Sequence, residues 1–160
     1  MTANELHEAY STNVSLRYGG EKTFWQLYRS GQFHFRTVWP AQEGEAVGYG
    51  DLCDFITDAM NGSASLYGAL GFSDQNLHVD VFFHQAENRL LNFPGMNTAE
   101  NVCRIPEIEV HLNCSAADLI SGREVHAGSL IRGICERFNV SDGRHLDLKD
   151  RIRRRLRQSN

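Results

Sequence analysis

Histidine recurs in three segments of this chain in which apolar and polar residues alternate. His34 lies in QFHFRTVW, His78 and His84 lie in LHVDVFFH, and His111 lies in EIEVHLN. Successive side chains of a strand point to opposite faces, so each of these histidines is predicted on the face opposite the apolar residues. An imidazole beside a carboxylate can bind a metal or transfer protons, because histidine titrates near neutral pH and a carboxylate can fix its tautomer.

Carboxylates share two of these predicted polar faces. Asp80 alternates with His78, and Glu107 and Glu109 alternate with His111. If the strands are neighbours, cross-strand side chains lie about 5 Å apart and could meet. The candidate binding residues are therefore His34, Arg36, His78, Asp80, Phe82, His84, Glu109 and His111.

Three interpretations of this face stay open. It is a polar outer sheet face, a binding surface on which Phe82 and Val38 expose apolar groups, or a metal or catalytic site. The sequence assigns no catalytic residue, no metal and no cofactor, because a solvated sheet face produces the same pattern. Strand order decides whether the histidines meet, and the sequence does not contain it.

Two further patterns are candidates for sites, namely a glycine-containing turn and the cysteines. GYGDLC, residues 48–53, precedes a predicted helix, but Cys53 replaces the third glycine of a dinucleotide fingerprint and Asp51 would repel a phosphate. We expect a loop that ends at a helix cap. Cysteine spacing matches neither a zinc knuckle nor CxxC, so free and mostly buried thiols are expected at Cys53, Cys103, Cys114 and Cys135.

The elements that position these residues follow from periodicity and end signals. The predicted strands cover residues 14–18, 32–39, 77–84, 89–93 and 107–113, with a hairpin through residues 85–88. Helices are predicted from a Thr2 and Glu5 capping box to Tyr10, over about ten residues before Gly31, and from Asp51 to a stop at Asn61 and Gly62. Two more helices are predicted, from Ser115 and Asp118 to Gly122 and over residues 126–138.

The C-terminal sequence LDLKDRIRRRLRQ predicts an amphipathic helix. Leu148, Ile152 and Leu156 recur every four residues and form its apolar seam. Arginines, Arg151 and Arg155 among them, cover the rest and could contact phosphates. We expect the seam to dock on the domain or on a partner subunit.

Charge and composition narrow the functional class. The chain has 160 residues, 41% of them hydrophobic, and a net charge of −4. Residues 150–160 carry +4, so the rest carries −8 and should repel nucleic acid. The first residues do not form a targeting signal, and no apolar run is long enough to span a membrane, so we expect a cytoplasmic protein.

One short resemblance points elsewhere. PEIEVHLNCSAADLISG, residues 106–122, resembles the strand and serine-capped helix of sterol-carrier-type lipid-binding domains. The resemblance implies a lipid carrier with an apolar cavity between sheet and helices. It covers 17 residues, and the final hairpin of that family is not evident after Gly122.

These observations predict an α+β fold, namely a two-layer sandwich with a mostly antiparallel sheet, helices on one face and a C-terminal amphipathic helix. Residues 1–143 are predicted to form one domain and residues 144–160 the basic helix. The leading functional hypothesis is a cytosolic protein-binding module of regulatory, inhibitor or immunity type that forms a homo-oligomer. The alternative is an enzyme or small-ligand carrier that uses the histidine and carboxylate face, with or without a metal.

Overall fold

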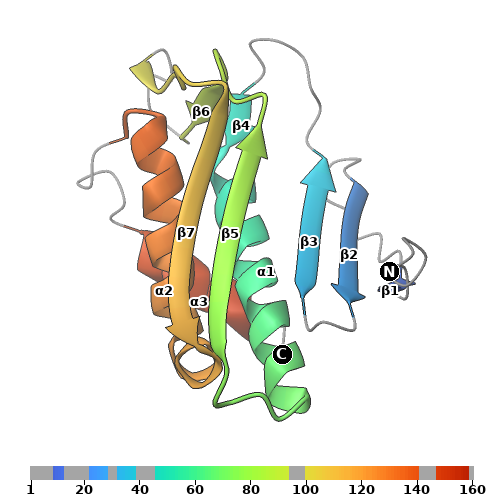
Figure 1. Ribbon diagram of the computed structural model, residues 1–160. Coiled ribbons are helices and arrows are strands. Elements are labelled where there is room, and N and C mark those ends of the chain that lie inside the picture. Colours follow the sequence, from blue (N-terminus) through green and yellow to red (C-terminus); the bar gives the residue numbers. More distant parts are fainter. Residues whose placement is uncertain are drawn as a thin grey trace, which may run out of the picture. The chain divides into compact units, whose positions relative to one another are not determined.

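The chain is an α+β protein, as its sequence predicts. The computed structural model describes residues 9–12, 22–28, 32–38, 46–93, 100–140 and 147–158, which form three helices and small sheets (Figure 1). The chain divides into two compact units, Met1–Ala41 and Gln42–Asn160. The predicted two-layer sandwich with one mostly antiparallel sheet is not confirmed, because the described strands form three separate sheets and one of them is parallel.

The N-terminal unit contains an antiparallel sheet in the order β1-β2-β3. Its strands are β1 (Ala9–Thr12), β2 (Lys22–Tyr28) and β3 (Phe33–Val38). β3 confirms the strand predicted over residues 32–39. The helix predicted before Gly31 is wrong, because this segment is β2, paired on both sides. Its threonine and three aromatic residues favour a strand over a helix.

The other predictions for this unit fall partly outside the described residues. Ala9 and Tyr10 belong to β1, so the predicted helix does not extend to Tyr10. Thr2 and Glu5 lie outside the described residues, and so does the strand predicted over residues 14–18.

The C-terminal unit begins with β4 (Ala46–Gly48) and the long helix α1 (Tyr49–Ala69). The predicted end at Asn61 and Gly62 is wrong, since α1 continues for two more turns. Asn61 is buried there and accepts a hydrogen bond of 2.6 Å from Arg123, a long-range contact that offsets the low helix propensity of Asn and Gly. The N-cap is Gly48, and Asp51 lies in the first turn, where its charge favours the helix dipole.

The strand predicted over residues 77–84 is β5 (Asn76–His84), but its partner is β7 (Glu107–Ser115). The predicted hairpin with residues 89–93 is wrong, because β6 (Leu90–Asn92) pairs in parallel with β4. Gln85 and Asn88 adopt φ values of 55° and 61°, and the Ala86 amide donates to the Pro106 carbonyl at 2.9 Å. This turn sends the chain away from β5.

Helix α2 (Ala116–Arg137) follows β7 directly. Ser115 caps it, as predicted, by accepting a hydrogen bond of 3.0 Å from the Asp118 amide. The two predicted helices are joined, and the break expected at Gly122 is a kink with φ −114° and ψ 20°. Gly133 lies against β7, where an added Cβ would come within 2.9 Å of Val110, so glycine lets helix and sheet approach closely.

Helix α3 (Leu148–Gln158) docks on α1 and α2 of its own unit. Leu148 and Ile152 are buried, and Leu156 is half-buried. Buried side chains from all three helices form the core with the inner faces of β5 and β7; the largest include Leu52, Ile56, Ile108, Leu130, Ile131, Ile134, Phe138 and Ile152.

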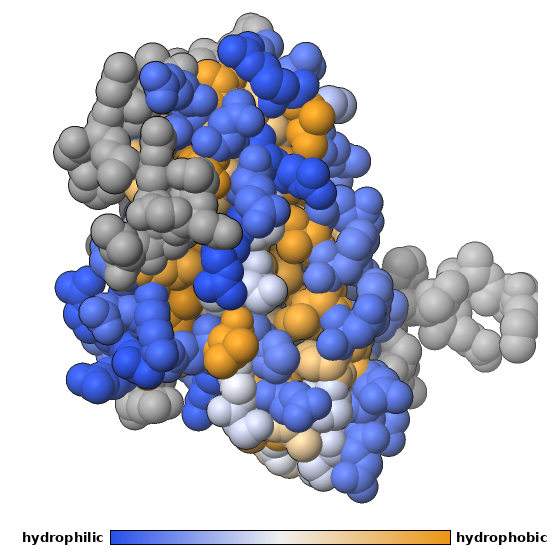
Figure 2. All heavy atoms as spheres, turned by 90° about the vertical axis from the view of Figure 1, so that its left-hand side faces the viewer, coloured by the Kyte–Doolittle hydropathy of each residue, from blue (hydrophilic) through white to orange (hydrophobic). Residues whose placement is uncertain are grey.

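On the face shown in Figure 2, hydrophilic side chains cover much of the described surface, and hydrophobic areas lie between them. Large exposed hydrophobic residues in the described part of the chain are Leu70, Phe72, Phe82, Ile105 and Val125. No helix among the described residues is long and apolar enough to cross a membrane.

Candidate functional site

The candidate site lies on the solvent-facing side of the β5–β7 pair. Helices α1 and α2 lie behind these strands (Figure 1), and the inner residues Phe83 and Ile108 are buried against them. Alternation therefore directs the other side chains into solvent. We call this surface the open face; its residues are His78, Asp80, Phe82, His84, Glu107, Glu109, His111 and Asn113, all exposed.

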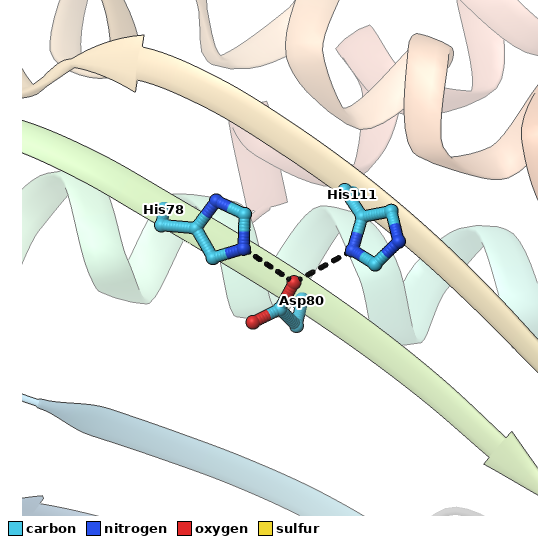
Figure 3. Close-up of side chains that lie close together, drawn as sticks. All are labelled: His78, Asp80 and His111. Atoms are coloured by element: carbon cyan, nitrogen blue, oxygen red, sulfur yellow. Dashed lines mark hydrogen bonds and ion pairs between the residues drawn. The ribbon is translucent and has the colours of Figure 1, made fainter.

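The strand register brings three of these residues together. Asp80 lies directly opposite His111, and His78 lies two residues before Asp80 on the same face. Asp80 Oδ1 lies 2.9 Å from His78 Nε2 and 2.8 Å from His111 Nδ1 (Figure 3). The two imidazole rings are nearly parallel, at 18°, with centroids 6.0 Å apart. We call this group the His–Asp–His cluster.

Two further groups orient the imidazoles of the cluster. His78 Nδ1 lies 2.6 Å from Asn113 Oδ1, and His111 Nε2 lies 3.9 Å from Glu109 Oε1. Each imidazole therefore has one nitrogen on Asp80 and the other facing an oxygen of a neighbouring side chain. A neutral histidine has one donor and one acceptor nitrogen, so each neutral imidazole can donate to only one of its two oxygen neighbours.

The hydrogen bond to Asp80 raises the pKa of His111, and the negative charges of Glu109 and Asp80 act in the same direction. His111 thus keeps its proton to a higher pH than a free imidazole does. The side chains of His78 and His111 are 57% and 51% exposed, so solvent screens the charges around them.

A second pair occupies the other end of the open face. His84 Nδ1 contacts Glu107 Oε1, and the Phe82 ring stacks on His84 with centroids 6.1 Å apart. Phe82 is 51% exposed. His84 lies four residues from Asp80, roughly 13 Å along the strand, so this pair is separate from the His–Asp–His cluster.

The predicted site residues are therefore brought together only in part. His78, Asp80 and His111 meet, Glu109 flanks them, and Phe82 and His84 form the neighbouring pair. His34 and Arg36 are exposed on β3 and belong to the N-terminal unit, whereas β5 and β7 belong to the C-terminal unit.

The predicted docking helix α3 is held by ion pairs as well as by its seam. Arg151 donates two hydrogen bonds of 3.2 Å to Asp54, and Arg155 donates two to Asp58. Burial raises the pKa of Asp54 and lowers that of Arg155, which is the effect of removing charged groups from water. Neither aspartate was predicted as a partner of α3, although their spacing of four residues matches that of Arg151 and Arg155.

The cysteines are free, and three are buried while Cys114 is partly exposed, as predicted. Burial raises the pKa of Cys53 to about 12 and that of Cys135 further. Helix α1 begins at Tyr49, so of the segment GYGDLC, where a loop was expected, only Gly48 precedes the helix, as its N-cap. After Gly122 the chain continues as α2, whereas sterol-carrier-type domains have a hairpin there.

The cluster's donor set can do two kinds of chemistry. Two imidazoles and a carboxylate can exchange protons near neutral pH. The same atoms are common ligands of transition metals.

Comparisons with protein-family models, with curated proteins and with solved structures found no match for this chain.

Proposed function

We propose that this chain is a small cytosolic protein-binding module without catalytic activity, of regulatory, inhibitor or immunity type. Its contact surface is the open face of β5 and β7. The observation that carries the proposal is Phe82, an aromatic residue that remains 51% exposed among the polar residues of the open face. Aromatic side chains are enriched at the centres of protein interfaces, where polar groups surround them.

The charge of the open face indicates the kind of protein that would fit it. Asp80, Glu107 and Glu109 carry negative charge, and neither β5 nor β7 contains a lysine or arginine. The histidines offset this charge only when they are protonated. The proposed partner is therefore a protein with a basic surface and an apolar pocket for Phe82.

The basic helix supports a protein partner over nucleic acid. Arg151, Arg153 and Arg155 pair with Asp54, Glu124 and Asp58 of the chain itself. Guanidinium groups engaged in this way would have to leave their carboxylates before they could contact phosphates. The acidic balance of the rest of the chain acts in the same direction.

The proposal includes the finer architecture expected from the sequence. We place β5 and β7 in the outer layer of a two-layer sandwich, with the helices as the inner layer. The packing of Gly133 against Val110 and of Phe138 against Phe83 supports this layering within the C-terminal unit. The homo-oligomer stays a prediction, although α3 already covers its seam on its own chain.

A matched pair of variants tests the binding role. The full chain captures interacting proteins from a lysate, and each captured protein is then purified and its dissociation constant measured. We expect Phe82→Ala to raise the dissociation constant for a partner that binds the open face at least tenfold, because the substitution removes an aromatic side chain from the interface. Val125→Ala is the control, since Val125 is 68% exposed on α2, away from the open face. A partner that binds Phe82→Ala as tightly as the unaltered chain contradicts the proposal.

The second candidate is an enzyme or small-ligand carrier. Convergence of His78 and His111 on Asp80 favours it, because these groups could transfer protons. Their exposure favours the binding role instead, since electrostatic catalysis is strongest where water is excluded.

A further inference from the structure

We propose that His78, Asp80 and His111 form a binding site for one divalent transition-metal ion, with Zn²⁺ as the expected ion. Each residue offers one donor atom, and the three atoms all lie within 4.8 Å of one another. This inference does not depend on the protein-binding role, because it rests on the cluster and not on Phe82.

The spacing of the donor atoms fits a small shift into a tetrahedral site. Asp80 Oδ1 lies 2.9 Å and 2.8 Å from the two imidazole nitrogens. Around a tetrahedral Zn²⁺ with bonds of about 2.0 Å, donor atoms lie about 3.3 Å apart. To hold an ion, Asp80 Oδ1 must move about half an ångström away from each nitrogen, and the two imidazole nitrogens, which lie within 4.8 Å of each other, must also stand about 3.3 Å apart.

The backbone holds the donors in place for such an ion. Asp80 and His111 are directly opposite in a register that pairs nine residues of β5 with nine of β7. Val110, the neighbour of His111, packs on Gly133 of α2. Sites built on paired strands keep their geometry better than sites on loops, so little ordering remains to be done when metal binds.

The groups around the donors provide an independent argument for a metal. If His78 binds through Nε2, its Nδ1–H donates to Asn113 Oδ1, which lies 2.6 Å away. If His111 binds through Nδ1, its Nε2–H faces Glu109 Oε1 at 3.9 Å. Metal-binding histidines almost always donate their other N–H to a carboxylate or carbonyl oxygen, which fixes the tautomer and strengthens the ligand.

The donor set selects the class of ion. Two imidazole nitrogens and one carboxylate oxygen suit Zn²⁺ and its neighbours Ni²⁺ and Cu²⁺, whereas Mg²⁺ and Ca²⁺ prefer oxygen ligands alone. The exposure of all three residues leaves the remaining coordination positions to water or to a donor from a bound molecule.

The open face also supplies a matched control. His84 has a carboxylate partner, Glu107, and a similar exposure, but the described residues give it no second imidazole within reach. A generic attraction of cations to this acidic face would act on both places. A specific metal site, by contrast, would bind the ion at the His–Asp–His cluster and not at His84.

Calorimetric titration of the full, tag-free and chelator-treated chain with Zn²⁺ alone tests the inference. We expect saturable binding of one equivalent. His78→Gln, Asp80→Asn and His111→Gln should each weaken it at least tenfold, while His84→Gln and Phe82→Ala change it less than twofold. Circular dichroism confirms that each variant is folded, and these substitutions lie on exposed positions.

Several outcomes would overturn the inference. They are the absence of saturable Zn²⁺ binding, equal weakening by His84→Gln, and Mg²⁺ binding of the same strength as Zn²⁺. Failure of this test leaves the binding role of Phe82 standing, provided that the dissociation constants of Phe82→Ala and Val125→Ala for the protein partner are measured with chelator present. Conversely, loss of partner binding in Phe82→Ala does not change the metal titration.

Discussion

Single residues give the C-terminal unit its chemistry, and Asp80 is the clearest case. One oxygen of its carboxylate faces two imidazoles that come from different strands. Among the described residues, the other carboxylate paired with the cluster is more distant, since Glu109 Oε1 lies 3.9 Å from His111 Nε2. Removal of the Asp80 carboxylate would therefore take from both histidines the oxygen that they share.

Cys53 shows the opposite effect, in which burial suppresses chemistry. Desolvation is the main cause that raises the pKa of its thiol to about 12, and a hydrogen bond with Tyr49 only partly opposes it. The folded chain keeps this proton, whereas an unfolded thiol loses it above a pH of about 8.5. Stability due to the neutral thiol is therefore complete below that pH and declines as the pH rises toward 12.

Cys53→Ala makes this effect measurable. At pH 7 the variant should be less stable than the unaltered chain, because alanine leaves a small cavity. Above pH 8.5 the difference in free energy of unfolding should shrink by about 1.4 kcal/mol per pH unit. Urea unfolding at pH 7, 9 and 10 checks this, and a difference that stays constant with pH would contradict it.

At the scale of elements, local patterns were predictable and pairings were not. Alternation in LHVDVFFH and EIEVHLN correctly gave β5 and β7 and the outward direction of His78, Asp80 and His111. Their pairing depends on contacts 31 residues apart in sequence for Asp80 and His111, which no local signal encodes. The segment at Leu90 is closer in sequence and was predicted as the partner of β5. The turn at Gln85 and Asn88 instead directs this segment to β4, with which it pairs.

Helices were misjudged where tertiary contacts override propensity. Asn61 and Gly62 resemble a stop signal, but a hydrogen bond from Arg123 keeps Asn61 in α1. In β2, apolar residues at helical spacing also fit a strand, and its pairing with β1 and β3 decides between them. The C-terminal helix α3 was predicted without knowledge of any tertiary contact, because its apolar seam repeats every four residues.

The ion pairs between α3 and α1 lead to a prediction at this scale. The side chains of Arg155 and Asp58 are only 19% and 14% exposed, so Arg155→Ala would leave a largely buried carboxylate without its bidentate partner. We expect a loss of about 2 kcal/mol in the free energy of unfolding. Arg157→Ala on the exposed side of the same helix should cost less than about 0.5 kcal/mol.

A double-mutant cycle separates the pair from other effects of the substitution. Urea unfolding of Asp58→Ala, Arg155→Ala and the double variant gives the coupling energy. The double variant should be more stable than the sum of the two single losses implies, because no charge is then left unpaired. Equal losses for Arg155→Ala and Arg157→Ala would show that the pair does not hold α3.

At the scale of the whole molecule, α3 completes the core of the C-terminal unit. It docks on α1, which lies far from it in the sequence. The pairs Arg151–Asp54 and Arg155–Asp58 are both separated by 97 positions. Ile152 also packs on Gly128 of α2, where an added Cβ would lie 3.6 Å from Ile152 Cδ1. The division at residues 41 and 42 was not visible in the sequence, because it follows from contacts that only the folded chain makes.

A chain that ends at Gly143 should therefore lose much of its stability. Burial of Leu148 and Ile152 contributes about 1.5 to 3 kcal/mol each, and the ion pairs add to this. We expect a loss of at least 4 kcal/mol by urea unfolding, with new binding of a hydrophobic dye to the exposed faces of α1 and α2. A chain that ends at Gln158 is the control and should match the full chain. Ile152→Ala, expected to cost about 2 to 5 kcal/mol, keeps the test decisive if the shortened chain does not fold. Light scattering on the same samples gives the mass of each form. If the shortened and full chains are equally stable and both monomeric, α3 neither completes the core nor joins subunits.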